Sequence, residues 1–251
     1  MKKVFLATIF LFAVFLPLAN AQAPTSTPSI KVPILIYHSV RPYYPGITKL
    51  VKEFTVPPDI FEDQLKYLYD NGFAPITPDD LTNNLISGKP LPPKPFIITL
   101  DDGWRNQFHY AFPILKKYND PAVFYIYSNV IDKKNFLTWD EVKTIMNANM
   151  IIGDHTKSHL ELPKIIDDNV LRQEIVESKK IIEDQIGKTV NDFAYPYGEY
   201  NDHVVGIVAQ AGYKSARTVV GGNYQTKEVL FTLNGIIITG DFNRFVALIN
   251  K

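Results

Sequence analysis

Two adjacent carboxylates mark the place in this sequence that is best suited to chemistry. Asp101 and Asp102 follow the apolar run 95–100, which predicts a buried strand, and a helix is expected at 104–117. Loops after buried strands carry the chemistry of many α/β folds. Because neighbouring residues there point in different directions, one aspartate can act as a base while the other holds a metal ion. The alternative is an ordinary turn, with Asp102 capping the helix.

Two histidines could provide partners for these carboxylates. His155 and His159 follow a second apolar run and are two of only five histidines in the chain. If residues 155–159 form a helical turn, both imidazoles share one face. Two imidazoles and one carboxylate, with coordination positions left open, are typical of hydrolytic and oxygenase metal centres. Asp154, directly before the first histidine, is expected either to support a ligand or to cap a turn.

These residues give the chain a family resemblance. It resembles the polysaccharide deacetylases of the NodB-homology group, carbohydrate esterase family 4. Residues 99–103, Thr-Leu-Asp-Asp-Gly, are similar to the first motif of that family, with Leu for Phe, and 155–159, His-Thr-Lys-Ser-His, to the second. Residues 194–198, Ala-Tyr-Pro-Tyr-Gly, are similar to the third, except that Ala194 replaces the usual arginine. The opening segment 32–38, Val-Pro-Ile-Leu-Ile-Tyr-His, is most similar to the branch acting on poly-β-1,6-N-acetylglucosamine.

Strand-like and helix-like segments alternate after residue 32, which predicts an α/β domain with a parallel sheet, open or closed. The resemblance implies the distorted (β/α) barrel of the NodB-homology type, with about seven strands. Helices are expected at 59–70, 77–88, 138–148, 169–186, 201–211 and 242–249. Further strands are expected at 32–37, 122–127, 190–194, 215–219 and 229–238.

The N-terminus predicts an export signal over residues 1–21. Two lysines precede an apolar run at 4–18, which ends in Ala-Asn-Ala at 19–21. The run is short for a membrane span, so an uncleaved anchor is the minor alternative. Cleavage would leave a Pro/Ser/Thr-rich leader at 22–31 and one deacetylase domain at 32–251. We therefore expect a protein of the cell envelope or the extracellular space, without a stable membrane span after processing.

Charge and cysteine content restrict the partners. Lys plus Arg and Asp plus Glu both number 26, so no net field recruits nucleic acid or an acidic polymer. A neutral polysaccharide suits this balance. The chain has no cysteine, which excludes disulfides and thiol catalysis.

One divalent metal ion is the expected cofactor, with Zn²⁺ favoured and Co²⁺, Ni²⁺ or Fe²⁺ as alternatives. The expected ligands are Asp102, His155 and His159. Such an ion would polarise an amide carbonyl, and Asp101 is the candidate base for the attacking water. The resemblance assigns an oxyanion-stabilising N–H to Tyr197, and Pro196 and Trp104 are expected beside the substrate. Tyr43 and Tyr44 are either walls of a sugar groove or parts of a packed loop.

The leaving amine requires an acid, for which a histidine is suited. No histidine follows His203, although the family usually carries this residue near the C-terminus. His203 and His109 fall within predicted helices and are better explained as structural. His38 ends a predicted buried strand, as Asp101 does, so both should reach the same rim of a parallel barrel. The resemblance to the β-1,6 branch implies the same placement.

These observations favour a secreted N-deacetylase that cuts the acetamides of a β-linked N-acetylglucosamine polymer, with poly-β-1,6-N-acetylglucosamine, a biofilm exopolysaccharide, as the favoured substrate. Peptidoglycan, chitin oligomers and acetylated xylan are the alternative substrates. A catalytically silent carbohydrate-binding barrel is the alternative of another class. A glycosidase is disfavoured, because its two carboxylates must stand about 5–10 Å apart across the scissile bond.

Overall fold

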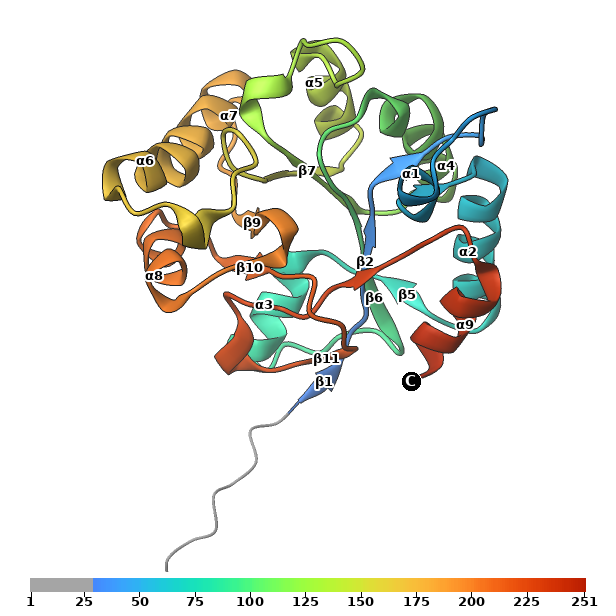
Figure 1. Ribbon diagram of the computed structural model, residues 1–251. Coiled ribbons are helices and arrows are strands. Elements are labelled where there is room, and N and C mark those ends of the chain that lie inside the picture. The colour runs from blue at the N-terminus through green and yellow to red at the C-terminus, as the bar shows by residue number, and fades with distance from the viewer. Residues whose placement is uncertain (1–28) are drawn as a thin grey trace, which may run out of the picture.

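The computed structural model describes residues 29–251, so the predicted export signal lies outside the described residues. A curled parallel sheet forms its centre, with the strand order β10-β9-β8-β7-β6-β2-β12 and with β5 paired beside β6. Helices surround this sheet (Figure 1). The predicted distorted (β/α) barrel is therefore confirmed as a seven-strand curled sheet within an α/β domain.

Except for the short β5, which was not predicted, the strands of this sheet lie at or within their predicted positions. They are β2 (Ile34–Tyr37), β5 (Ala74–Pro75), β6 (Pro95–Leu100), β7 (Ala122–Ile126), β8 (Ile151–Asp154), β9 (Asp192–Ala194), β10 (Ser215–Arg217) and β12 (Ile236–Ile237). Tyr37 pairs with Leu100, and Ile126 pairs with Asp154. Because every pairing in this sheet is parallel, the segments after β2, β6 and β8 leave the sheet at one rim.

The segment predicted as a strand at 229–238 is mostly irregular and brings the two edges of the sheet together. Leu233 forms a bridge with Arg217 of β10, and β12 then pairs with β2. Two small sheets lie outside the barrel. They consist of β1 (Ile30–Lys31) with β11 (Tyr224–Gln225), and of β3 (Ser39–Val40) with β4 (Thr55–Val56).

Except for α1, which lies in a segment where no helix was predicted, the helices begin and end close to the residues that the sequence signals indicate. They are α1 (Lys49–Glu53), α2 (Pro58–Asp70), α3 (Pro78–Ser87), α4 (Phe112–Tyr118), α5 (Trp139–Asn147), α6 (Asp168–Arg172), α7 (Ser178–Ile186), α8 (Asp202–Gln210) and α9 (Phe242–Asn250). Thr138 and Glu141 form the predicted capping box of α5, and Asn201 caps α8. Within residues 29–251, no helix is both long and apolar enough to cross a membrane.

Two predicted helices contain a π turn that the apolar periodicity does not indicate. The helix expected at 104–117 consists of the π-helix Gln107–Ala111 followed by α4. The helix expected at 169–186 is interrupted between α6 and α7 by the π-helix Gln173–Glu177. Each π turn directs a buried polar side chain, Gln107 or Glu174, toward segments that follow strands of the barrel. Single π turns are uncommon and frequently occur at functional sites.

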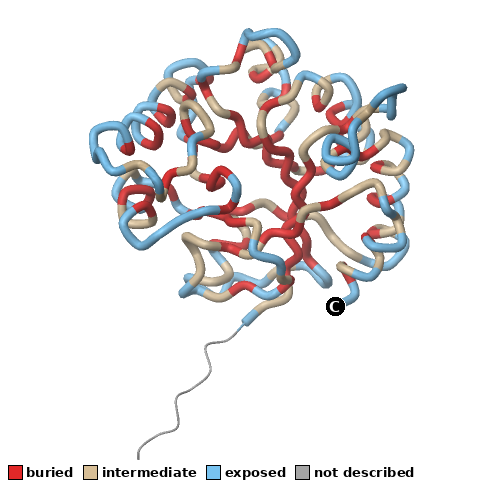
Figure 2. Tube along the Cα trace, in the orientation of Figure 1, coloured by how far each residue is buried: buried red, intermediate tan, exposed pale blue. Residues whose placement is uncertain are grey.

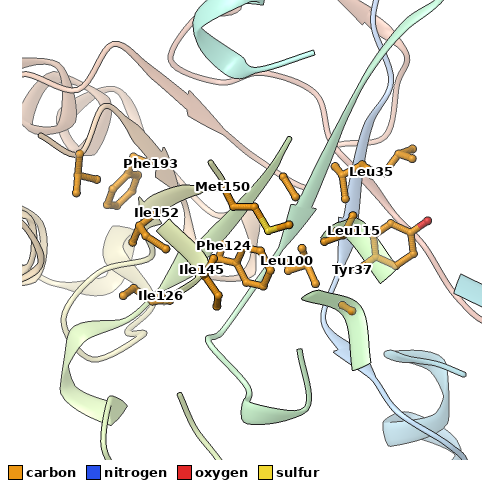
Figure 3. Close-up of a cluster of buried hydrophobic side chains, with 14 of the residues drawn as sticks. Leu35, Tyr37, Leu100, Leu115, Phe124, Ile126, Ile145, Met150, Ile152 and Phe193 are labelled. Carbon is orange, nitrogen blue, oxygen red and sulfur yellow. The ribbon is translucent and has the colours of Figure 1, made fainter. Parts of the chain in front are cut away.

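The main hydrophobic core fills the space between the sheet and the helices. Figure 2 shows buried residues along the central strands and on the sides of the helices that face them. Figure 3 shows part of this core, in which side chains from several strands meet side chains from α4 and α5. The labelled strand residues include Leu35, Tyr37, Leu100, Phe124 and Ile152. The inner face of the sheet is less uniformly apolar, because it also encloses Arg217 and Asp101.

Gly153 of β8 leaves space for an aromatic ring inside the barrel. A Cβ atom at this position would lie 2.4 Å from two ring carbons of Tyr125. We expect Gly153→Ala to lower the free energy of unfolding by about 1–3 kcal/mol, the usual cost of overpacking. Gly206→Ala in α8 is the control, since nothing lies within 4 Å of its new methyl group. That change should raise the stability by up to about 1 kcal/mol. Urea unfolding measures both changes. A Gly153→Ala variant as stable as the Gly206→Ala variant would contradict the packing argument.

Candidate active site

A cavity of about 1280 Å³ opens at the rim where the parallel strands end. Its wall includes seven of the residues expected to act in the site: His38, Asp101, Asp102, Trp104, His155, His159 and Tyr197. Pro196 is buried directly before Tyr197. The loops after four strands, β2, β6, β8 and β9, therefore bring residues far apart in sequence to one place, as expected for a parallel α/β fold.

The two adjacent aspartates point in different directions. Asp101 is 2% exposed, and its carboxylate forms an ion pair with Arg217. Asp102 has a φ of 74°, in the left-handed region that aspartate tolerates better than most residues, and its carboxylate lies beside the two histidines. The backbone thus separates one carboxylate that faces the barrel interior from one that faces the histidines.

Asp102, His155 and His159 form a site that fits a divalent metal ion. Oδ1 of Asp102 lies 3.6 Å from Nε2 of His155 and 3.5 Å from Nε2 of His159. One ligand atom from each residue lies within 4.8 Å of the others. Bonds of about 2.0–2.1 Å in a tetrahedral site place neighbouring ligand atoms about 3.3 Å apart, close to the two distances from Oδ1 of Asp102. Two imidazoles and a carboxylate suit Zn²⁺ and neighbouring first-row ions.

Hydrogen bonds hold two of these ligands in the required state. Nδ1 of His155 lies 2.7 Å from the carbonyl oxygen of Ala194, an arrangement that places the proton on Nδ1 and leaves Nε2 free to bind a metal. Burial lowers the pKa of His155 to about 4, so the imidazole is neutral. Nε1 of Trp104 donates to Oδ2 of Asp102 at 3.0 Å, which leaves Oδ1 facing the histidines. Trp104 therefore orients a candidate metal ligand, Asp102, as well as lining the cavity.

The segment 155–159 is not the helical turn that would have placed both imidazoles on one face. Thr156 and His159 have φ values of 72° and 58°, and the segment forms an irregular loop. The N–H of Thr156 donates to Oδ1 of Asp154 at 2.8 Å, and the N–H of His159 donates to Oγ1 of Thr156 at 2.9 Å. Asp154 thus caps the turn. The two imidazole rings still meet, with centroids 4.7 Å apart.

The partner of Asp101 is an arginine that the sequence motifs did not indicate. Arg217 of β10 is 1% exposed, and its guanidinium group donates to Oδ1 of Asp101. The group also lies over the ring of Tyr125, at 4.8 Å from its centroid. Arg217 of β10 lies directly opposite Ala194 of β9. Ala194 occupies the position where the family motif usually has its arginine, so the observed arginine is on the neighbouring strand. One signal in the sequence could have indicated this pair. Arg217 falls within the strand predicted at 215–219, and a buried cation requires an anionic partner.

The charges around Asp101 keep it ionised. Burial raises the pKa of Asp101, but Arg217, His155 and His38 together outweigh that effect and hold its pKa below the usual value. Nε2 of Gln107 donates to the carbonyl oxygens of His38 and Asp101, at 2.6 and 2.5 Å, and joins the ends of β2 and β6. The His38 ring packs edge-on against Phe54, with centroids 4.9 Å apart.

The other candidate histidines have different surroundings. His203 lies outside the cavity wall and pairs with Asp168 at 2.7 Å on the surface. His109, expected to be structural, is instead exposed and lines the cavity. Its position on the wall makes it a further residue that a bound molecule could touch.

The outer part of the cavity has an exposed apolar and aromatic wall. Tyr43, Tyr44 and Leu50 line it, with exposed fractions of 40%, 43% and 65%. Arg41 lies over the ring of Tyr44 at 4.6 Å, and Lys52 lies over the ring of Tyr43 at 5.0 Å. The two tyrosines therefore form part of the groove wall, which was one of the two alternatives.

Comparisons with known proteins agree with this geometry. The family model described as polysaccharide deacetylase matches residues 88–216. YxkH of Bacillus subtilis is 28% identical over 220 residues, which are 88% of this chain and 75% of that protein. The poly-β-1,6-N-acetyl-D-glucosamine N-deacetylase of Staphylococcus aureus is 26% identical over 201 residues, 72% of this chain and 69% of that protein. The Streptococcus pyogenes deacetylase PplD, solved in complex with acetate, superposes with a TM-score of 0.81 at 27% identity, covering 88% of this chain and 99% of PplD.

The Asp101–Arg217 pair yields a stability prediction. We expect Arg217→Met to cost about 3–5 kcal/mol of unfolding free energy, because it leaves a buried carboxylate without its cation. Adding Ala194→Arg to that variant should restore most of the loss, because the paired positions of β9 and β10 have side chains on one face.

Arg105→Met is the matched control, since Arg105 pairs with Glu141 at 2.9 Å but is 45% exposed. It should cost at most about 1 kcal/mol. Urea unfolding at neutral pH compares the variants. An Arg217→Met protein as stable as the wild type would show that the buried Asp101 carboxylate does not need Arg217.

Proposed function

The chain belongs to the polysaccharide deacetylase family, and from this premise we propose that it is a metal-dependent N-deacetylase acting on a β-linked N-acetylglucosamine polymer. The observation that carries the proposal is the convergence of Asp102, His155 and His159 beside the buried Asp101–Arg217 pair in one cavity. A catalytically silent carbohydrate-binding barrel would have no need of this arrangement.

The residues divide the hydrolysis of the amide between them. Asp102, His155 and His159 would hold a divalent ion, whose Lewis acidity would polarise the acetamide carbonyl and make water more acidic. Asp101, ionised through its pairing with Arg217, accepts the proton of the attacking water. As the carbon–nitrogen bond breaks, His38 donates a proton to the leaving amine, and acetate is released.

Tyr197 is assigned to stabilise the oxyanion of the tetrahedral intermediate through its backbone N–H. The assignment is supported by its place on the cavity wall and by its ring, which lies against His159 with centroids 4.7 Å apart. Its φ of 59° places a non-glycine residue in the left-handed region, as occurs at many active sites. The following Gly198 cannot carry a side chain, since a Cβ atom there would lie 2.6 Å from the backbone nitrogen of Val219.

Poly-β-1,6-N-acetylglucosamine is the favoured substrate. Support comes from the Staphylococcus aureus N-deacetylase, at 26% identity, and from the aromatic wall of the cavity, because aromatic faces pack against sugar rings. Peptidoglycan, chitin oligomers and acetylated xylan are the alternatives. Acetate release from matched β-1,6- and β-1,4-linked oligomers distinguishes them, and faster release from the β-1,4 series would overturn the favoured linkage.

We further propose that the protein is exported. The support is the sequence of residues 1–21, with its basic start, apolar run and small-residue cleavage site. The intact mass of the exported protein should correspond to a start at Gln22. A full-length species would indicate an uncleaved anchor instead.

The roles of the two aspartates are separable by substitution. Asp102→Asn or His155→Ala should release the metal, because a three-ligand site loses a ligand. Asp101→Asn should keep the metal and lower acetate release by about 10²-fold or more, the usual contribution of a general base. Metal analysis and acetate release from β-1,6-linked oligomers measure both effects. If Asp101→Asn empties the site and Asp102→Asn does not, the roles are reversed.

His38 is tested against a second histidine of the same chain. We expect His38→Ala to retain metal and to lose most deacetylation, because the leaving amine then lacks its proton donor. His203→Ala is the matched control, since His203 pairs with Asp168 on the surface, and its turnover should be normal. Near-normal turnover of the His38 variant would show that another group protonates the amine.

A further inference from the structure

The loop that carries two of the three metal-binding residues is attached to a helix by one buried carboxylate. Oε2 of Glu174 accepts the N–H of Ser158 at 2.8 Å, and the carbonyl oxygen of Glu174 accepts the N–H of Lys157 at 3.0 Å. Glu174 is only 4% exposed. We propose that Glu174 is a positioning residue that holds the loop 155–159 in its metal-binding conformation. The inference rests on the proposed function, because it presumes that the loop binds a metal.

The π turn between α6 and α7 places Glu174 in this position. The N–H of Ser178, which a continuous α-helix would direct to the carbonyl of Glu174, donates instead to the carbonyl of Ile175. The carbonyl of Glu174 meets the N–H of Lys157, and its side chain meets the next N–H along the loop. Glu174 therefore accepts hydrogen bonds from two consecutive N–H groups of the loop. The π turn makes this possible because it leaves the carbonyl of Glu174 free of the helix.

The loop requires this support because its backbone is strained. Thr156 and His159 both have positive φ values, and such conformations cost about 1–3 kcal/mol each for residues other than glycine. The loop is also held by the N–H groups of Ser128 and Asn129, which donate to the carbonyls of Thr156 and Lys157 at 3.2 and 2.9 Å. Glu174 and the segment 128–129 thus hold the loop together.

The two histidine ligands depend on Glu174 to different degrees. His155 is attached to the sheet, because its N–H donates to the carbonyl of Ile126 at 2.9 Å and its ring contacts the carbonyl of Ala194. His159 directly follows Ser158, and its own N–H is bonded only within the loop, to Thr156. Loss of Glu174 should therefore release His159 first and leave a site with two well-held ligands.

Four variants test this inference through metal affinity. Glu174→Ala removes the acceptor, and Glu174→Asp keeps the charge but withdraws it by one methylene. Both should bind Zn²⁺ about 10–100-fold more weakly in competition with a chelator, the usual cost of losing a partner of a metal ligand. Glu174→Gln retains an acceptor oxygen and should lose less. In the Asp variant, the visible spectrum of bound Co²⁺ should also change, because one imidazole is less firmly held.

Glu177→Ala is the matched control. Glu177 lies in the same π turn and contacts the same loop, but through an exposed side-chain ion pair with Lys157 at 2.5 Å. Its loss should change the Zn²⁺ affinity by less than about threefold, the scale of an exposed pair. If Glu174→Ala does not fold, the Zn²⁺ affinities of Glu174→Asp and Glu174→Gln are compared instead. Weaker binding by the Asp variant supports the inference, and equal, unchanged affinities overturn it.

The outcomes separate this inference from the proposed function. Unchanged Zn²⁺ affinity in Glu174→Ala and Glu174→Asp, with equal loss of stability in the metal-free and metal-loaded proteins, would make Glu174 merely structural and overturn the inference. If the wild-type protein itself binds no divalent ion, the metal-dependent function fails as well, and the inference fails with it.

Discussion

A buried carboxylate at the end of β6 needs a cation, and Arg217 provides it from across the barrel. β6 and β10 are not neighbours, since β7, β8 and β9 lie between them in the sheet. Only a sheet that curls can bring their side chains together. The guanidinium group also packs on Tyr125, for which Gly153 leaves the space. The direction of Asp101, and with it the separate direction of Asp102, therefore depends on the curvature of the whole sheet.

The precision of the site comes from helices that hold the loops, and both π turns contribute to it. Gln107 joins the carbonyls that follow β2 and β6, whereas Glu174 holds the loop that follows β8. Loops alone are poor supports for a metal centre, because ligands displaced by even a fraction of an ångström bind less well. The segments after β2, β6 and β8 are each fixed by a buried polar side chain from one of the two π turns.

Much of this arrangement follows from the sequence by local rules. Apolar runs located the strands, capping residues such as Thr138 located helix starts, and parallel strands explain why His38, Asp101 and His155 share a rim. The π turns and the non-helical loop at 155–159 could not be predicted, because hydrogen bonds to distant segments outweigh local helix propensity there. The partnership of Arg217 with Asp101 was hidden for a similar reason, since it depends on the register of β9 with β10 and on the curl of the sheet.

We propose that this cavity hydrolyses acetamides with the help of a metal ion. The most direct test measures acetate release from an N-acetylglucosamine oligomer by one preparation in three states: as purified, after removal of metal by a chelator, and after addition of one equivalent of Zn²⁺. Release should stop on metal removal and return with one equivalent of ion per chain. Undiminished release from the metal-free protein, with its fold intact, would contradict it.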